Sequence, residues 1–204
     1  MDALEAIKTR RSTRKFKEDM PPRELLDKII EAGRYAPSGH NSQTTHLIVI
    51  TDKKIHEEIT AVVKDALSKM EAGPDTYVSL KYAIEASKKD GYTFFYQAPV
   101  LIVAANKKGY GNALADTGCV LENMMIAANA LDLGSCWINN LHWLDENEQV
   151  REYLYQYGLE KDETITGGLA VGYAFNGLPE RTPLERKGNP VTWVGSDDLQ
   201  RPKE

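Results

Sequence analysis

The run Arg10-Arg11-Ser12-Thr13-Arg14-Lys15-Phe16 lies near the start of the chain. It brings four cations and two hydroxyl groups together within six residues, and an aromatic residue follows them. A guanidinium group donates two parallel, charge-assisted hydrogen bonds that match a phosphate, and hydroxyl groups can add further donors. Short basic runs also occur in solvated turns and in nucleic-acid patches, so the run alone leaves three interpretations open.

The overall composition narrows the choice of partner. The 204 residues include 25 Lys and Arg against 30 Asp and Glu, and the formal net charge is −5. A general nucleic-acid or membrane-surface protein would carry an excess of positive charge, so we expect neither partner. The basic run is therefore a local feature of an acidic protein.

The chain carries no signal for export or membrane insertion. No targeting segment opens it, and no apolar run approaches the roughly eighteen residues needed to span a bilayer. The two cysteines, Cys119 and Cys136, form no C-x-x-C pair and lie in apolar stretches typical of reduced core thiols. We therefore expect a cytoplasmic protein.

Helical and extended patterns alternate along the chain. Apolar residues recur at helical spacing in several segments, and short unbroken apolar runs indicate buried strands. We expect helices at 3–8, from Pro21-Pro22 to Gly33, at 52–70, in part of 76–97, at 113–133 and at 145–157, and strands at 47–50, 99–105, 135–138 and 164–173. This order predicts one α+β domain over residues 1–204, with helices on both faces of a small sheet of four or five strands. Residues 176–204 would form an extended C-terminal tail.

The segment 113–133 is the most apolar of the predicted helices. Apolar residues occur around most of its circumference, and Gly118, Ala127, Ala128 and Ala130 keep it thin. A helix of this kind is buried on nearly all sides, either in a domain core or in a subunit interface.

Several familiar catalytic motifs are missing from the sequence. There is no G-x-G-x-x-G, no P-loop and no G-x-S-x-G, so the dinucleotide-fold, NTPase and serine-hydrolase classes lack their local chemistry. The four histidines show no spacing typical of a metal site, and we expect no metal. The arginine run and the polar loop 37–43 remain the best chemical signals.

Several short motifs follow one another in a recognisable order. They are Arg10-Arg11-Ser12-Thr13-Arg14-x-Phe16, Ala36-Pro37-Ser38-Gly39-His40-Asn41-Ser42-Gln43, Ala98-Pro99, Asp116-x-Gly118, Asn123-Met124-Met125, Gly134-Ser135-Cys136-Trp137-Ile138, Gly172-Tyr173 and Pro179-x-Arg181-x-Pro183-Leu184. Together they resemble the nitroreductase-like family of FMN-dependent NAD(P)H oxidoreductases, over about the whole chain. The resemblance implies a small central mixed sheet flanked by helices, and an intertwined homodimer with FMN at its interface.

The resemblance also assigns residues to the cofactor. It implies that Arg10, Arg11, Ser12 and Arg14 hold the phosphate, the ribityl chain and the pyrimidine edge, and that Arg181 joins them at the phosphate. The other chain would approach the flavin with Pro37, Ser38, Gly39 and Asn41, and Gln43 would lie close behind. Ile138, Asn139 and Asn140 would lie beside the ring, near N5. No catalytic side chain is implied, because the flavin carries the redox chemistry.

The implied activity is a ping-pong reduction. NADH or NADPH would reduce the flavin, and a nitroaromatic, a quinone or another electron-poor small molecule would then be reduced on the same face. Three alternatives stay open. They are a specialised flavin reductase, dehalogenase or enoate-type reductase of the same fold, a non-catalytic FMN-binding or storage module, and an α+β dimer whose arginines bind another phosphate.

One departure from the family concerns the lid of the pocket. The loop 106–112 is too short for the helix that some members insert there. We expect the segment with Tyr92, Phe94, Phe95 and Tyr96 to form the lid instead. If this segment is extended, Phe94 and Tyr96 point to one side and Phe95 to the other.

Overall fold

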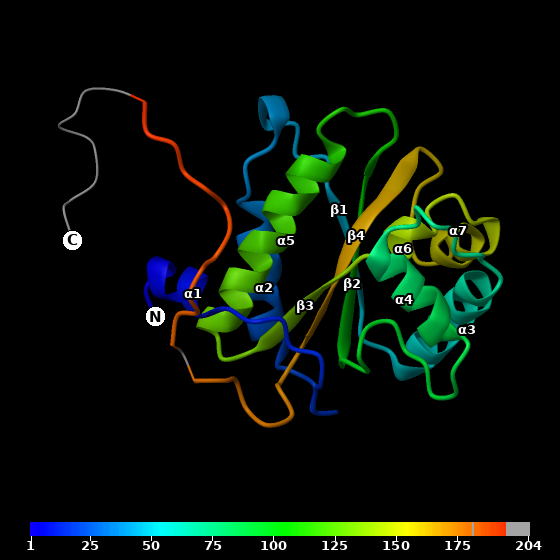
Figure 1. The fold of residues 1–204 in the computed structure, drawn as a ribbon, viewed down its shortest axis with the longest axis horizontal. Helices are drawn as coiled ribbons and strands as arrows, with labels where there is room; N and C mark the ends of the chain where they lie inside the picture. Colours follow the sequence, from blue (N-terminus) through cyan, green and yellow to red (C-terminus); the bar gives the residue numbers. More distant parts are fainter. Residues whose placement is uncertain (181, 195–204) are drawn as a thin grey trace.

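The computed structural model describes residues 1–180 and 182–194. A four-stranded sheet stands between two groups of helices (Figure 1). Its strands are β1 (His46–Ile50), β2 (Val100–Lys107), β3 (Gly134–Ile138) and β4 (Glu163–Gly172), in the order β1-β2-β4-β3. The last strand of the chain therefore lies inside the sheet, between β2 and β3.

The pairings among the four strands are antiparallel. The sheet's parallel contact is an isolated bridge between Ser12 and Ser135, so the parallel part of the mixed sheet that we expected is limited to that bridge. Residues 100–105 of β2 are all buried, as an unbroken apolar run predicts for a strand covered on both faces. Gly168 lets β4 approach β2 closely, since a Cβ there would lie 2.8 Å from the carbonyl oxygen of Ile102.

Three helices cover one face of the sheet: α1 (Ala3–Thr9), α2 (Arg23–Arg34) and α5 (Ala113–Ala130) (Figure 1). Their contact with the sheet is a buried cluster that includes Leu26, Ile29, Ile102, Leu121, Met124 and Leu169. The other face carries α3 (Lys53–Ser68), α4 (Val78–Ser87), α6 (Asn140–Trp143) and α7 (Glu148–Tyr155). Here the core includes Ile59, Val63, Leu67, Leu101, Val103, Leu154 and Ala170.

Two predicted helix boundaries are wrong. The helix predicted at 145–157 corresponds to α7 and begins only at Glu148, because the Asn147 side chain caps it by accepting a hydrogen bond from the backbone N–H of Val150; the short α6 before it was not predicted. The helix predicted to reach residue 133 ends at Ala130, since the chain turns at Asp132, whose φ is +62°. The remaining predicted elements differ from the observed bounds by a few residues at their ends.

A buried ion pair fixes α6 and α7 to the sheet. The Arg151 guanidinium lies 2.9 Å from the Asp145 carboxylate and donates a second hydrogen bond to the carbonyl oxygen of Glu163. The same carboxylate accepts the backbone N–H of Ile165 in β4. Because both charges are paired and hydrogen-bonded, their burial is tolerated, and the connection from α6 to α7 is held against β4.

One side of α5 is left uncovered within the described part of the single chain. The helix packs on α1, on α2 and on the sheet, while Leu114 is 58% exposed and Cys119 is also exposed. A side chain at Gly118 would come near only Trp137, at 3.9 Å. The prediction that Cys119 is a core thiol is therefore wrong for the single chain, whereas Cys136 is buried in β3 as predicted.

Beyond β4 the chain continues as the predicted extended tail, with no helix or strand in the described residues from 176 to 194. Figure 1 shows it leaving the lower end of the sheet and passing outside α1. Its apolar residues Val191 and Trp193 are 69% and 64% exposed. No helix among the described residues is long and apolar enough to cross a membrane.

Candidate active site

The basic run forms an extended segment along the end of the sheet. We call this segment, residues 10–16, the strap. The backbone N–H of Thr13 donates to the carbonyl oxygen of Ser135 at 2.8 Å, and Phe16 forms an isolated bridge with Ala174. The Thr13 side chain points inward and packs on Gly134. A Cβ added to Gly134 would lie only 2.5 Å from the Thr13 hydroxyl oxygen. Since side chains alternate along an extended chain, the neighbours Ser12 and Arg14 point the other way, into a pocket.

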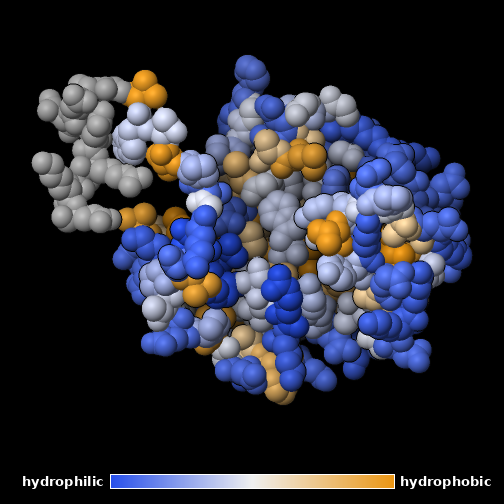
Figure 2. All heavy atoms as spheres, viewed as in Figure 1, coloured by the Kyte–Doolittle hydropathy of each residue, from blue (hydrophilic) through white to orange (hydrophobic). Residues whose placement is uncertain are grey.

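This pocket has a volume of about 580 Å³ and lies between the strap, β3 and α4. Figure 2 shows hydrophobic and weakly polar residues near the centre of this face, among hydrophilic ones. The pocket is lined by Ser12 and Arg14 of the strap, by Cys136, Trp137, Ile138, Asn139, Asn140 and Trp143, by Ser79, Tyr82, Ala83 and Ala86 of α4, and by Tyr92, Thr93, Phe94 and Tyr96. It thus joins residues that are more than a hundred positions apart in sequence.

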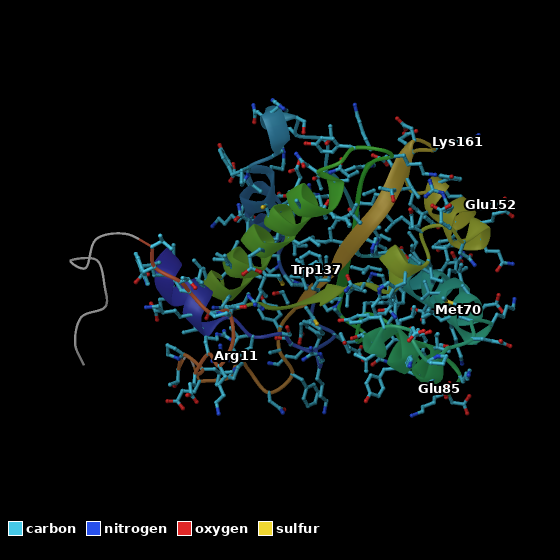
Figure 3. The ribbon with its side chains drawn as sticks, turned by 45° about the horizontal axis from the view of Figure 1, so that its top comes forward. Arg11, Met70, Glu85, Trp137, Glu152 and Lys161 are labelled. Atoms are coloured by element: carbon cyan, nitrogen blue, oxygen red, sulfur yellow. The ribbon has the colours of Figure 1, made fainter. Side chains whose placement is uncertain are left out.

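The three arginines of the strap differ in what they contact. Arg11 donates hydrogen bonds to the carbonyl oxygens of Lys8, Arg10 and Thr182, so it ties the tail to the strap (Figure 3). The Nε of Arg10 is buried without a hydrogen-bond partner and lies 3.5 Å from a Glu122 carboxylate oxygen. Arg14 is exposed and forms no ion pair within the described residues. Arg10 and Arg14 are therefore the cations that a ligand could use most readily.

The end of β3 presents two asparagines whose side chains are already engaged. The Asn139 amide oxygen accepts from the Trp137 ring at 2.6 Å, and the Asn140 amide donates to the Tyr92 hydroxyl at 3.2 Å. Burial raises the pKa of Tyr92 well above its ordinary value, and it also raises the pKa of the Cys136 thiol. Both groups are therefore uncharged at neutral pH, and the wall of the pocket is a poorly solvated surface.

The polar loop 37–43 is built from a different set of contacts. The backbone N–H of Gly39 donates to both carboxylate oxygens of Asp116, and the Tyr110 hydroxyl donates to the same carboxylate at 2.9 Å. A Cβ on Gly39 would lie 2.2 Å from the end of the Asn112 side chain, so a larger residue here would push that side chain aside. His40, Asn41 and Gln43 all have positive φ, which fixes an unusual loop shape.

The loop 37–43 does not meet the strap within one chain. Asp116, which holds the loop, lies in the first turn of α5, whereas Asn129 near the other end of α5 donates to Ala6 and Thr9 of α1, just before the strap. At 1.5 Å of rise per residue, these two points of the helix are about 20 Å apart. Pro37, Ser38, Gly39, Asn41 and Gln43 therefore line no pocket with Ser12 and Arg14 in the single chain.

Comparison with known protein families shows to which family this chain belongs. Residues 7–173 match the sequence model of the Nitroreductase family. The chain belongs to the nitroreductase family. The family named from the sequence motifs is thus confirmed.

Three relatives illustrate how this nitroreductase-family chain compares with others. It is 32% identical to a nitroreductase from Bacteroides fragilis solved with bound FMN, over 96% of this chain and 100% of that one, with a TM-score of 0.82. It is 26% identical to a nitrobenzene nitroreductase from Ectopseudomonas oleovorans, over 85% of this chain and 87% of the relative. It is 25% identical to a 4-nitrobenzoate reductase from a Nocardioides strain, over 97% and 92% of the two chains.

In this nitroreductase-family chain, the structure brings some of the predicted site residues together and keeps others apart. The structure brings Ser12, Arg14, Ile138, Asn139 and Asn140 together in one pocket. Arg10 is not among the residues that line this pocket. The loop residues lie elsewhere, and Arg181 falls outside the described residues. The roles assigned to all of these residues stay predictions.

The aromatic segment before β2 lines the pocket with Tyr92, Phe94 and Tyr96, whereas Phe95 does not line it, so the predicted sides of these rings agree with the structure. Phe94 and Phe95 are both largely buried, at 4% and 3% exposure. The segment turns instead of extending, and Tyr96 has a φ of +60°. The contribution of α4 was not predicted, because its small and hydroxyl-bearing residues form no motif and meet the pocket only through the tertiary fold.

Proposed function

We propose that this protein is an FMN-dependent oxidoreductase that takes electrons from NADH or NADPH and passes them to nitroaromatics, quinones or related electron-poor acceptors. The observation that supports this most is that Ser12 and Arg14 of the strap, the end of β3 and an aromatic wall meet at one pocket. The cation suits a phosphate or a reduced flavin, and the aromatic wall suits the flat ring of an acceptor placed beside the flavin. Donor and acceptor would occupy the same pocket in turn, which predicts ping-pong kinetics.

The residues of the strap fit a phosphate group. A buried donor without a hydrogen bond costs about 1–3 kcal/mol, and Arg10 Nε makes no hydrogen bond within the described residues, although the Glu122 carboxylate lies 3.5 Å away and offsets part of that cost. A phosphate beside Arg10 would supply the hydrogen-bond acceptor, and the Ser12 hydroxyl would add a donor. Arg11 would contribute less, because its donors already hold backbone carbonyl groups. Arg181 is proposed to join the phosphate site from the tail.

The end of β3 fits a flat polar ring. When bound, FMN would supply the hydride-transfer chemistry, and the protein would bind and orient it. A guanidinium such as that of Arg14 lowers the cost of the negative charge that reduction places on a flavin. Because the side chains of Asn139 and Asn140 are engaged with Trp137 and Tyr92, we assign contact with the ring to the backbone of residues 138–140.

The complete site is proposed to need a second copy of the chain. The loop 37–43 is held in a fixed shape, but its residues do not line the pocket that Ser12 and Arg14 line in the described part of the chain. The uncovered side of α5 carries exposed Leu114, and α1 exposes Leu4 and Ile7. A homodimer that buries these surfaces would remove apolar area from water and could bring the loop of one chain to the strap of the other.

Anaerobic reduction of the purified protein tests the proposal. We expect a yellow protein whose flavin absorbance is bleached by NADH or NADPH and restored by a nitroaromatic or a quinone. A colourless protein that gains no colour when FMN is added would contradict the cofactor and leave another phosphate ligand as the interpretation. A yellow protein that neither nucleotide bleaches would indicate a storage module, and reoxidation by one acceptor type alone would indicate a specialised reductase.

A further inference from the structure

The part of the pocket away from the strap carries no charged side chain. Its lining residues from α4 and from the aromatic segment are Ser79, Tyr82, Ala83, Ala86, Tyr92, Thr93, Phe94 and Tyr96, with Trp143 of α6 beside them. We call this set the acceptor wall. Among the described residues that line the pocket, Arg14 is the charged one, and it belongs to the strap that is assigned to the cofactor.

The acceptor wall is built mainly from rings. Tyr92, Phe94 and Tyr96 come from one turn of chain, and the Trp143 ring packs edge-on to Tyr77 with 6.2 Å between centroids. Tyr82 is 73% exposed on the α4 side of the pocket. Aromatic rings favour offset or edge-to-face contact with another flat ring, so the wall suits a planar aromatic ligand.

The polar groups of the acceptor wall are neutral hydrogen-bonding groups. The Thr93 hydroxyl oxygen is buried without a partner among the described residues. The Tyr92 hydroxyl accepts from Asn140, which leaves its own proton available for donation. An uncharged polar substituent can bond to such groups, whereas a carboxylate would find no cation to compensate its loss of water.

The electrostatic surroundings of the acceptor wall also disfavour a negatively charged ligand. Burial is the leading cause of the raised pKa of Tyr92, so this environment opposes formation of an anion on the wall itself. Asn140 lowers that pKa through its hydrogen bond but does not offset the burial. A carboxylate placed against the same rings would meet the same penalty.

We propose that the acceptor wall selects planar, uncharged aromatic acceptors and discriminates against acceptors that carry a carboxylate. The inference rests on the proposed function, because it names the substrate class of that site. The inference predicts that this chain prefers an uncharged acceptor such as nitrobenzene over a charged one such as 4-nitrobenzoate. Sequence identity does not make this choice, because it is about equal for the nitrobenzene and the 4-nitrobenzoate relatives.

A matched pair of acceptors tests the selectivity. 4-Nitrobenzamide and 4-nitrobenzoate have nearly the same shape, and only the second is an anion at pH 7. With the NAD(P)H-reduced holoenzyme, we expect kcat/KM to favour the amide by about tenfold or more after division by the rates with free reduced FMN. Equal values, or a preference for the carboxylate, would overturn the inference while leaving the proposed function in place.

A binding measurement gives a readout without turnover. Benzamide and benzoate cannot be reduced at a nitro group, and each can be titrated into the oxidised holoprotein while the flavin spectrum is recorded. We expect the Kd of benzoate to exceed that of benzamide by about tenfold or more. If benzoate binds as tightly as benzamide, the acceptor wall does not exclude anions.

Two substitutions at Ala86 test whether the lack of a cation on the acceptor wall causes the selectivity. Ala86→Lys places a cation on the acceptor wall, and Ala86→Met adds similar bulk without charge. Ala86 is half-buried on α4, so the lysine head can reach both solvent and ligand. We expect Ala86→Lys to raise kcat/KM for 4-nitrobenzoate relative to 4-nitrobenzamide by roughly three- to tenfold, and Ala86→Met to leave that ratio unchanged.

The outcomes distinguish a failure of the selectivity inference from a failure of the proposed function. Equal ratios in the wild type, Ala86→Lys and Ala86→Met would show that charge on the wall does not govern selectivity. Should Ala86→Lys fail to fold, the wild-type acceptor ratio and the two titrations still decide. A protein that binds no FMN, or whose flavin no nucleotide reduces, would overturn the proposed function itself and this inference with it.

Discussion

The strap 10–16 and the loop 37–43 carry motifs of one family, yet the fold holds them in opposite ways. The strap is held by its backbone, through Ser135 and Ala174, so Ser12 and Arg14 keep their side chains free for a pocket. The loop is held by the side chains of Asp116 and Tyr110, and none of its residues lines the pocket of the strap. Under the proposed function, a single chain would therefore hold two half-sites, about 20 Å apart along α5.

Breaking the proposed dimer should have the largest effect. Gly118 lies on the uncovered side of α5, where an added side chain meets only Trp137 of its own chain, at 3.9 Å. We therefore expect Gly118→Leu to leave a single chain foldable but to prevent close approach of a second α5. Light scattering should give a monomer or an insoluble product without flavin. A flavin-loaded Gly118→Leu dimer would contradict the proposed use of this surface.

Substitution within the strap should have the next largest effect. Arg10→Ala removes the guanidinium whose Nε makes no hydrogen bond within the described residues, and a charged hydrogen bond is worth roughly 1.5–3 kcal/mol. We expect FMN affinity to fall by about one to two decades, as measured by fluorescence titration. Arg11→Ala is the matched control, because Arg11 holds backbone carbonyls, and its effect should be several-fold smaller. Equal losses would show that Arg10 has no special role.

Distorting the loop should weaken FMN binding less, by about tenfold. Gly39→Leu forces the Asn112 and Tyr110 side chains to move, since a Cβ would lie 2.2 Å and 2.6 Å from them. Gly111→Leu adds the same side chain nearby, in open space, and should leave FMN affinity unchanged. If FMN titration shows no difference between these variants, the loop takes no part in the cofactor site.

The smallest effect concerns the acceptor wall. Tyr92→Phe removes the hydroxyl that accepts from Asn140 and keeps the ring. We expect a two- to fivefold change in acceptor ratios of kcat/KM, with stability lowered by about 1 kcal/mol at most. Phe95→Ala is the contrasting variant, because that ring is 3% exposed in the core, and it should cost roughly 3–5 kcal/mol with acceptor ratios unchanged. Thermal unfolding and initial rates of both variants check this.

The sequence predicts the elements well where the signal is local. The unbroken apolar run of β2 and the apolar periodicity of α2 and α3 identify buried elements without any knowledge of their neighbours. The family motifs likewise predict the fold class. The prediction lacks α6, whose single turn is too short for a periodic pattern, and it starts α7 too early, because the true start depends on one capping side chain, that of Asn147.

The site was predictable only where residues lie in motifs. Ser12, Arg14 and residues 138–140 do meet in one pocket, as their motifs suggest. The sequence could not reveal that Arg11 is engaged by Thr182, because that contact depends on where the tail passes. It also could not place α4 in the pocket, or bury both Phe94 and Phe95, because a turn with positive φ at Tyr96 reorients the segment.

The central claim, that each site combines the strap of one chain with the loop of the other, can be tested by complementation. One chain carries Arg10→Ala and Arg14→Ala, the second carries Gly39→Leu, and different affinity tags allow the mixed dimer to be purified. A shared site leaves one intact combination, so the mixed dimer should bind one FMN with wild-type affinity although neither parent homodimer does. If the mixed dimer binds no FMN more tightly than its parents, each site is built within a single chain and the claim is wrong.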